Sequence, residues 1–317
     1  MHAIQVKTNH ALVLEEAPSP VLGADDLRIA VRATAVNRAD LLQRAGRYPP
    51  PPGASEIIGL ECAGVVAEVG ANVRDWNVGD RVMALLPGGG YASEVVVHAG
   101  SAMHVPDALS DEEAAALPEV FLTAFLNLFL LARVREGETA LIHGGGSGVG
   151  TAATTLCKLA GARVIVTAGS PEKCAKCIEH GADVAIDYRE EDFVEKAKGA
   201  NVILDHIGAR YLARDLDALA IDGRIVVIGS MGGERSTELD VGKLLMKRAS
   251  IIGSTLRSRS NESKAEIVRA FLDRFGSDLV AGRVRPVVHA VLPLAQADDA
   301  HDLMESSDHF GKIVLKV

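Results

Sequence analysis

The chain has 317 residues, 48% of them hydrophobic and 24% charged, and a net charge of −9 at pH 7. This length is enough for two domains with substantial cores, and the composition is that of an ordinary globular protein. The acidic balance argues against a nucleic-acid partner. The longest apolar stretch, residues 121–132, is too short to span a bilayer, which argues against a membrane partner. The start lacks a signal-peptide pattern and four cysteines make no disulfide framework, so we expect a cytoplasmic protein.

Residues 2–105 predict a strand-rich domain. Short β-branched runs alternate there with turn sequences such as Asn77 to Asp80 and Pro87 to Gly90. The runs predict strands at residues 27–33, 64–69, 81–85 and 93–98. Together they indicate a compact β-barrel-like domain. The proline-rich segment 48–53 interrupts this domain and should be stiff.

Helices and strands alternate from Ser110 onward. We expect helices from residue 111 through the apolar run that follows, at 149–160 and at 171–180. The strands between them are expected at 139–143, 163–167, 184–186, 201–205, 223–228 and 250–253. Parallel strands need such crossovers, so the pattern indicates a doubly wound parallel sheet of the Rossmann type and an α/β fold class. A helix near 262–275 and strands near 287–292 and 313–317 then return to the first domain.

The glycine-rich segment 144–150 follows one of these strands and begins the next helix. Glycines let the backbone turn sharply and approach a pyrophosphate, and the free N–H groups of a helix start attract its charge. The strict G-x-G-x-x-G spacing is absent, but the strand–glycine–helix–strand context is that of a dinucleotide site. A glycine-rich turn without a ligand is the alternative.

The end of the second strand predicts which dinucleotide binds. A site that prefers NAD carries an acid about 20 residues after the glycines, where it bonds the ribose 2′-hydroxyl. Residues 168–173 instead read Ala-Gly-Ser-Pro-Glu-Lys. Ser170 can donate a hydrogen bond to a 2′-phosphate, and Lys173 supplies positive charge. The sequence therefore favours NADP(H) over NAD(H).

Cys174 and Cys177 form a C-x-x-C pattern in the helix expected after the second strand. Neither a second cysteine pair nor a histidine cluster accompanies it, so we do not expect a metal or redox site there. Cys62 and Cys157 are expected to be small buried side chains.

The domain order and several motifs resemble the medium-chain dehydrogenase/reductase family. Residues 59–70 resemble its GHE-type segment, and residues 78–82 its VGDRV turn. Within the family, the chain is most similar to the zinc-free quinone oxidoreductases, and closest to the tumour-suppressor-inducible type. The matching segments span almost the whole chain: 37–41, 48–55, 147–151, 167–170, 256–259 and 311–315. The resemblance implies a GroES-like β-barrel catalytic domain of residues 1–118 and 256–317, and a Rossmann NADP(H)-binding domain of residues 119–255.

Two residues depart from the zinc alcohol dehydrogenases of this family. Asn37 stands where those enzymes have their first cysteine ligand, and Leu60 where they have a ligand histidine. A catalytic zinc needs three protein ligands, so we expect no metal. Without a Lewis acid, hydride transfer should run toward an acceptor that is already electrophilic, such as a quinone or a conjugated enone.

The resemblance also implies site residues. On the substrate side these are Asn37 and Tyr48, in the kind of cleft where such folds bind ligands. Tyr48 would stack on a quinone ring or bond its carbonyl; a purely structural tyrosine is the alternative. His143 is expected to support the glycine loop. The implied contacts to the pyrophosphate are Ser147, Gly148, Val149 and Gly150. Those to the 2′-phosphate are Gly169, Ser170, Lys173 and Tyr188. The other implied cofactor contacts are Thr123, Gly229, Met231, Gly232, Thr255, Leu256, Arg257 and Lys312.

The sequence thus predicts NADPH-dependent reduction of a quinone or conjugated carbonyl without a metal. A 2-alkenal or enoyl reductase on the same scaffold is one alternative, and a weakly catalytic, crystallin-like NADPH-binding protein is another. By resemblance we expect a homodimer that pairs along an edge of the Rossmann sheet, near residues 223–233 and 250–254.

Overall fold

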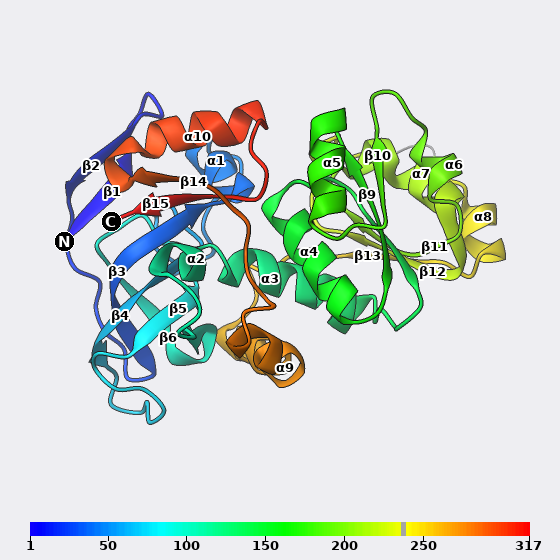
Figure 1. Cartoon of the computed structure of the whole chain (residues 1–317). Coiled ribbons are helices and arrows are strands. Elements are labelled where there is room, and N and C mark those ends of the chain that lie inside the picture. The colour runs from blue at the N-terminus through cyan, green and yellow to red at the C-terminus, as the bar shows by residue number, and fades with distance from the viewer. Residues whose placement is uncertain (236–238) are drawn as a thin grey trace. The chain divides into compact units, whose positions relative to one another are not determined.

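The computed structural model describes residues 1–235 and 239–317 and divides the chain into two compact units (Figure 1). Residues 1–122 and 256–317 form the first unit, and residues 123–255 form the second. The division falls inside helix α3 (Pro118–Phe125). A six-residue π-helical segment, Leu126–Leu131, continues this helix into the second unit.

The first unit is built on a seven-stranded sheet with the path β14-β15-β3-β4-β5-β7, and β6 also pairs with β3. Only β14 and β15 run parallel; the other pairs are antiparallel. All four strands expected in this region are present. The strands are β3 (Asp26–Val36), β4 (Glu61–Val69), β5 (Arg81–Leu85), β6 (Glu94–His98), β7 (Ala102–His104), β14 (Val288–Pro293) and β15 (Lys312–Lys316).

Several elements of the first unit were not predicted. They are the hairpin β1 (His2–Val6) and β2 (Leu12–Glu16), helix α1 (Arg38–Arg44) and helix α10 (Ala297–Ser306). The hairpin and α10 share one apolar core, which includes Ile4, Leu12 and Ala300. The expected helix near 262–275 is longer in the structure, where α9 spans Asn261–Val280.

The second unit holds a six-stranded parallel sheet of order β10-β9-β8-β11-β12-β13, as the alternating pattern predicted. The chain winds outward from β8 to β10, returns to β11 beside β8, and continues to β13, so the sheet is doubly wound. Its strands are β8 (Thr139–Ile142), β9 (Arg163–Ala168), β10 (Val184–Asp187), β11 (Ala200–Asp205), β12 (Leu219–Val227) and β13 (Ser250–Gly253). Its other helices are α4 (Gly148–Leu159), α5 (Pro171–Glu179), α6 (Phe193–Lys196), α7 (Ala209–Ala218) and α8 (Val241–Met246).

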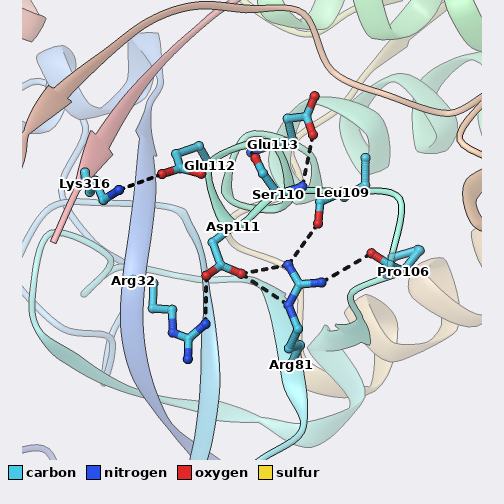
Figure 2. A network of polar contacts seen from close by, with 9 residues as sticks. All are labelled: Arg32, Arg81, Pro106, Leu109, Ser110, Asp111, Glu112, Glu113 and Lys316. Carbon is cyan, nitrogen blue, oxygen red and sulfur yellow. Dashed lines mark hydrogen bonds and ion pairs between the residues drawn. The ribbon is translucent and has the colours of Figure 1, made fainter.

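A polar network holds helix α2 (Asp111–Ala115) against the sheet of the first unit (Figure 2). Ser110 caps the helix: its Oγ accepts from the Glu113 N–H at 3.2 Å, and its own N–H donates to Glu113 Oε2 at 3.0 Å. Such reciprocal bonds satisfy donors that a helix start leaves open. Asp111 accepts from Arg81 Nη2 at 2.8 Å and from Arg32 Nη1 at 2.9 Å.

Two further contacts extend this network. Arg81 Nη2 also donates to the carbonyl oxygen of Leu109 at 2.9 Å, and Lys316 Nζ lies 3.1 Å from Glu112 Oε1 (Figure 2). Strands β3, β5 and β15 are therefore all bonded to one short helix. Burial opposes ionisation of Asp111, but the hydrogen bonds and charges of Arg81 and Arg32 outweigh it and lower the pKa of the Asp111 carboxyl.

We predict that Asp111→Asn lowers the free energy of unfolding by about 1–2 kcal/mol, because it removes charge-assisted bonds to two arginines. Urea unfolding measures the change. Asp222→Asn is the matched control: Asp222 also forms a two-bond pair with an arginine, Arg248, but both of those side chains are exposed. Its effect should stay within about 0.5 kcal/mol. Equal losses in the two variants would contradict the prediction.

Candidate active site

The predicted pyrophosphate loop joins the carboxyl end of β8 to the start of α4. Gly144 has a φ of +65°, and a Cβ on it would collide with the ring of His206. A Cβ on Gly150 would collide with the Gly144 carbonyl oxygen, so the first turn of α4 packs directly on the loop. Only glycine fits both positions. The loop is thus folded around close backbone approach, as a phosphate site requires.

The first turn of α4 leaves backbone donors open. Ser147 caps the helix, and its Oγ accepts from the Gly150 N–H at 3.0 Å. The Thr151 N–H bonds the Ser147 carbonyl at 2.9 Å. Within the ranges that the structure describes, neither the Gly148 N–H nor the Val149 N–H has a hydrogen-bond acceptor. These two N–H groups and the helix dipole form a fitting place for a pyrophosphate.

The predicted 2′-phosphate residues meet at the ends of two neighbouring strands. Tyr188 follows β10, and Gly169 and Ser170 follow β9, its partner strand. A Cβ on Gly169 would lie 2.7 Å from the Tyr188 hydroxyl oxygen, so the phenol packs on the glycine. Ser170 caps α5 by accepting from the Lys173 N–H at 3.3 Å. The structure therefore gathers a hydroxyl, a phenol and a lysine at this point, with no acid at the end of β9.

The predicted cofactor residues Gly229, Met231, Gly232 and Thr255 lie on the same edge of this sheet. Residues 229–233 follow β12, and Thr255 follows β13, so each comes after the carboxyl end of a parallel strand. The Gly232 N–H donates to the Ile207 carbonyl at 2.6 Å, which holds this loop against the loop after β11. Met231 is 58% exposed. Ligands of doubly wound sheets bind along this edge.

A buried polar group supports the glycine loop from below. The His143 Nε2 lies 2.8 Å from Asp215 Oδ1, and its Nδ1 lies 3.1 Å from the Thr167 hydroxyl. The same hydroxyl accepts from the Gly144 N–H at 3.2 Å. His143 thus links the ends of β8 and β9 to α7. This arrangement agrees with the supporting role expected for His143.

In the first unit, Asn37 and Lys312 lie together in a buried polar cluster with Glu61. The Lys312 Nζ donates to Asn37 Oδ1 at 2.6 Å and lies 2.8 Å from Glu61 Oε1. Asn37 Nδ2 donates to the same Glu61 oxygen at 2.9 Å. The other Glu61 oxygen accepts from the Glu119 N–H at 2.8 Å. The amide of Asn37 is therefore fully engaged within the protein, and Lys312 is only 2% exposed.

A second buried cluster lies beside the first at the start of α1. Asp40 Oδ2 accepts from the Asn37 N–H at 2.8 Å and from the Tyr91 hydroxyl at 3.2 Å. The Tyr91 oxygen lies 3.1 Å from His301 Nε2. Asp40 Oδ1 is buried and has no partner among the described residues. Burial raises the pKa of Asp40 to about 7, although bonds from Asn37 and Tyr91 and the charge of Lys312 oppose this. Burial and the charge of Arg44 lower the pKa of His301 to about 3.

Tyr48 is held by Arg257. The guanidinium carbon lies 5.2 Å from the centre of the tyrosine ring, and Nη1 donates to the Tyr48 carbonyl at 3.3 Å. The Tyr48 hydroxyl has no hydrogen-bond acceptor or donor in the part of the chain that the structure describes. Partial burial raises the pKa of this phenol, and Arg257 opposes the shift. Tyr48 therefore stays a neutral donor with a free hydroxyl.

Two further predicted cofactor residues, Thr123 and Leu256, are buried. Thr123 is 8% exposed, and its carbonyl accepts from Asn127 Nδ2 at 2.7 Å. Burial raises the pKa of Cys174 and raises that of Cys177 to about 12, so both thiols stay protonated.

The structure describes residues 1–235 and 239–317. No group of three or more His, Cys, Asp and Glu side chains there could hold a metal, and no helix there is long and apolar enough to cross a membrane. A surface cavity of about 490 Å³ lies in the first unit, lined by Trp76, His104 and Arg269 among others, and contains none of the predicted site residues.

A glycine loop and free helix donors at the carboxyl edge of a doubly wound sheet define the second unit as a dinucleotide-binding fold. Family models agree with both units. Residues 148–273 match the zinc-binding dehydrogenase model, and residues 23–107 match the alcohol dehydrogenase GroES-like domain. The rat quinone oxidoreductase is 31% identical over 304 residues, which cover 93% of this chain and 90% of the rat protein. The chain belongs to the medium-chain dehydrogenase/reductase family and is an oxidoreductase of that family.

Solved structures give the same fold. The Escherichia coli quinone oxidoreductase complexed with NADPH is 27% identical, with a TM-score of 0.83, and the match covers 100% of this chain and 99% of that one. A structure described as an NAD-dependent alcohol dehydrogenase is 32% identical, with a TM-score of 0.86 and complete coverage of both chains. The fold is therefore shared by relatives with different named cofactors, and the cofactor of this chain must be argued from its own residues.

Sequence reasoning missed two acids of the site region. Glu61 was part of a recognised segment but received no role, although it bonds both Asn37 and Lys312. Asp205, at the end of β11, was read only as strand, yet its carboxylate accepts from the N–H groups of Ile207 and Gly208 at 2.6 and 3.0 Å. An acid at the carboxyl end of a buried strand was the available signal for Asp205.

We predict that Asp40→Asn flattens the pH dependence of stability between about pH 4 and pH 7. The folded-state pKa of Asp40, about 7, lies above its ordinary value of 3.8, so the folded protein holds this proton more tightly. Stability should therefore fall as the pH rises through this window, and the fall should be smaller in the variant, whose amide does not ionise. Urea unfolding at pH 5 and pH 8 measures it. An identical difference between variant and wild type at both pH values would contradict the prediction.

Proposed function

We propose that the protein is an NADPH-dependent quinone oxidoreductase that works without zinc. The observation that carries the proposal is the buried cluster of Asn37, Glu61 and Lys312. Asn37 stands where zinc-dependent relatives have a cysteine ligand, and an ammonium group already lies between Asn37 and Glu61. The neighbouring Leu60 is an apolar residue, 2% exposed. These side chains do not fit a zinc ion, which needs three ligands around an open position.

The preference for NADPH is supported by the end of β9. Gly169, Ser170 and Lys173 lie there beside Tyr188, without the acid that would accept from a ribose 2′-hydroxyl. The Gly148 and Val149 N–H groups would hold the pyrophosphate. When bound, the nicotinamide supplies the hydride. The name of the rat relative and the NADPH of the E. coli structure support the same assignment.

Tyr48 is the substrate residue of this proposal. Its ring offers an apolar face on which a quinone can stack, and its free hydroxyl can donate to a quinone oxygen as negative charge develops there. Asn37 acts through the backbone instead: its amide is bonded to Glu61 and Lys312, and its N–H bonds Asp40 at the start of α1. We therefore assign Asn37 a positioning role for the segment that carries Tyr48.

We predict that Lys173→Ala raises the KM for NADPH at least about tenfold while leaving the KM for NADH nearly unchanged, because a charge-assisted bond to phosphate is lost. The measurement is cofactor oxidation with 1,2-naphthoquinone and, separately, with a 2-alkenal. Lys176→Ala is the matched control, since this exposed lysine lies three residues further along α5. Equal use of both cofactors by the wild type would refute the NADPH assignment. Turnover of the 2-alkenal far above that of the quinone would make the protein an enone reductase instead.

We also propose a cytoplasmic homodimer. The four cysteines are free thiols, which supports a reducing compartment. Of the two expected contact segments, only β13 lies at a sheet edge, because β12 runs between β11 and β13. Beside it, apolar side chains gather on the surface: Ile221, Val241, Leu245 and Met246 are 59–78% exposed. An open strand edge with such a patch is a typical protein contact.

We predict by light scattering a mass of twice the 33.3 kDa of one chain, and a shift toward monomer in Leu245→Glu/Met246→Glu, because charges would be placed inside the contact. Val280→Glu provides the control, since Val280 is equally exposed (70%) on α9 of the other unit. A monomeric wild type would refute the dimer.

A further inference from the structure

Arg257 is a buried arginine whose donors reach three separate segments of the first unit. It is 5% exposed and directly follows Leu256, at which the chain returns from the second unit. Its Nε donates to the Pro87 carbonyl at 2.8 Å, its Nη1 to the Tyr48 carbonyl at 3.3 Å and its Nη2 to Gln43 Oε1 at 2.6 Å. All three acceptors are neutral oxygens. A planar guanidinium can bind three acceptors in this way because its N–H groups point in fixed, different directions.

The segment that carries Tyr48 depends on side chains from outside it for its orientation. Residues 49–52 are four prolines, which have no N–H to donate. Such a run is stiff, so its direction follows from the points at which it is fixed. One of these is the Gln43 side chain, whose Nε2 donates to the Glu56 carbonyl at 2.8 Å and so joins residues on either side of the run. Another is the bond from Arg257 to the Tyr48 carbonyl.

Arg257 also fixes the Tyr48 ring. Its guanidinium carbon lies 5.2 Å from the ring centre, which is a cation–π distance. The cation takes one face of the ring, so an aromatic acceptor can stack only on the opposite face. One side chain thus holds both the carbonyl and the ring of Tyr48, and the hydroxyl at the end of that ring is positioned with them. Through Gln43 and Pro87, the same guanidinium joins the proline-rich segment to α1 and to the loop after β5.

We propose that Arg257 is the positioning residue of the acceptor site: it orients Tyr48 for stacking on flat aromatic acceptors and does not bind the cofactor. This rests on the proposed function, because it concerns the acceptor residue of that site. The family resemblance implies a cofactor contact for Arg257, but three of its five N–H groups are already used within the first unit. Lysine could not replace it, since an ammonium offers no planar fork to three acceptors.

Binding of a redox-inert aromatic ketone tests the proposal without turnover. We would measure by calorimetry the Kd of 1-acetylnaphthalene in a double-mutant cycle of Arg257→Met and Tyr48→Leu. Arg257→Met should weaken binding at least about tenfold in the wild-type background but less than about twofold beside Tyr48→Leu, because its effect passes through the tyrosine. Arg269→Met, which removes an exposed arginine from α9, is the matched control and should leave the Kd unchanged. Equal losses in both backgrounds, or no binding by the wild type, would overturn the proposal.

Two further variants separate positioning from charge and from folding. Gln43→Leu keeps the guanidinium but removes the acceptor of its Nη2, so it should weaken binding in the same direction as Arg257→Met, again only where Tyr48 is present. This variant decides the question if Arg257→Met does not fold. Arg257→Lys keeps the charge but should recover little of the affinity. Full recovery by lysine, or an unchanged Kd in Gln43→Leu, would contradict the positioning role.

Cofactor binding and turnover distinguish this proposal from its alternatives. The Kd of NADPH should change less than about twofold in Arg257→Met; a loss of about tenfold or more would make Arg257 a cofactor contact instead. In turnover with 1,2-naphthoquinone, Arg257→Met should lower kcat/KM at least about tenfold, and this loss should disappear beside Tyr48→Leu. If the wild type reduces no quinone while the binding cycle still shows coupling, the proposed quinone reduction fails and the role of Arg257 stands.

Discussion

The ion pair of Lys312 with Glu61 is the contact on which the first unit depends. Lys312 begins β15, Glu61 begins β4, and Asn37, which bonds both, follows β3. The cluster of Lys312, Glu61 and Asn37 thus joins the C-terminal strand β15 to strands β3 and β4, which lie more than two hundred residues earlier in the sequence. Taking both charges out of water is expensive, and hydrophobic residues of similar volume often stabilise a core as well. What the pair provides is a fixed register, because removing either partner leaves an uncompensated charge in the core.

In the second unit, a histidine forms the comparable buried polar contact. His143 bonds the buried Asp215, and the Thr167 hydroxyl accepts from the backbone beneath the glycine loop. The loop itself contains no side chain large enough to fix its shape, so a rigid polar support beneath it holds the N–H groups of Gly148 and Val149 in place. In both units, buried polar groups lie next to the segments for which we propose ligand contacts. Such groups restrict conformation most where apolar packing is sparse, and this is where positioning matters most.

The sequence predicted the doubly wound sheet well, because periodic apolar runs and glycines are local signals. It ended the strand before the glycine loop at His143, whereas the strand ends at Ile142. Helix α1 was missed because its seven residues are stabilised by Asp40, whose partner Tyr91 lies 51 residues away. The ion pair of Lys312 was likewise beyond local reading: the family resemblance implied a cofactor contact for Lys312, and only the tertiary structure pairs it with Glu61. Contacts of this kind depend on which distant strands meet, and no periodicity encodes them.

An ammonium ion between Asn37 and Glu61 changes which reactions the fold can support. A divalent ion in a site with an open position can polarise an alcohol or carbonyl oxygen directly, whereas the Lys312 ammonium is saturated by the Val36 carbonyl, Asn37 and Glu61. It therefore has no donor left for a substrate. Polarisation of the acceptor must come from a group that is still free, and the Tyr48 hydroxyl is such a group in the described part of the first unit. One hydrogen bond from a neutral phenol stabilises an oxyanion far less than a metal does. The proposed reaction fits this arrangement, because hydride transfer to an acceptor whose electrophilicity is built in needs less polarisation, and this is the physical argument for proposing a quinone rather than a simple ketone.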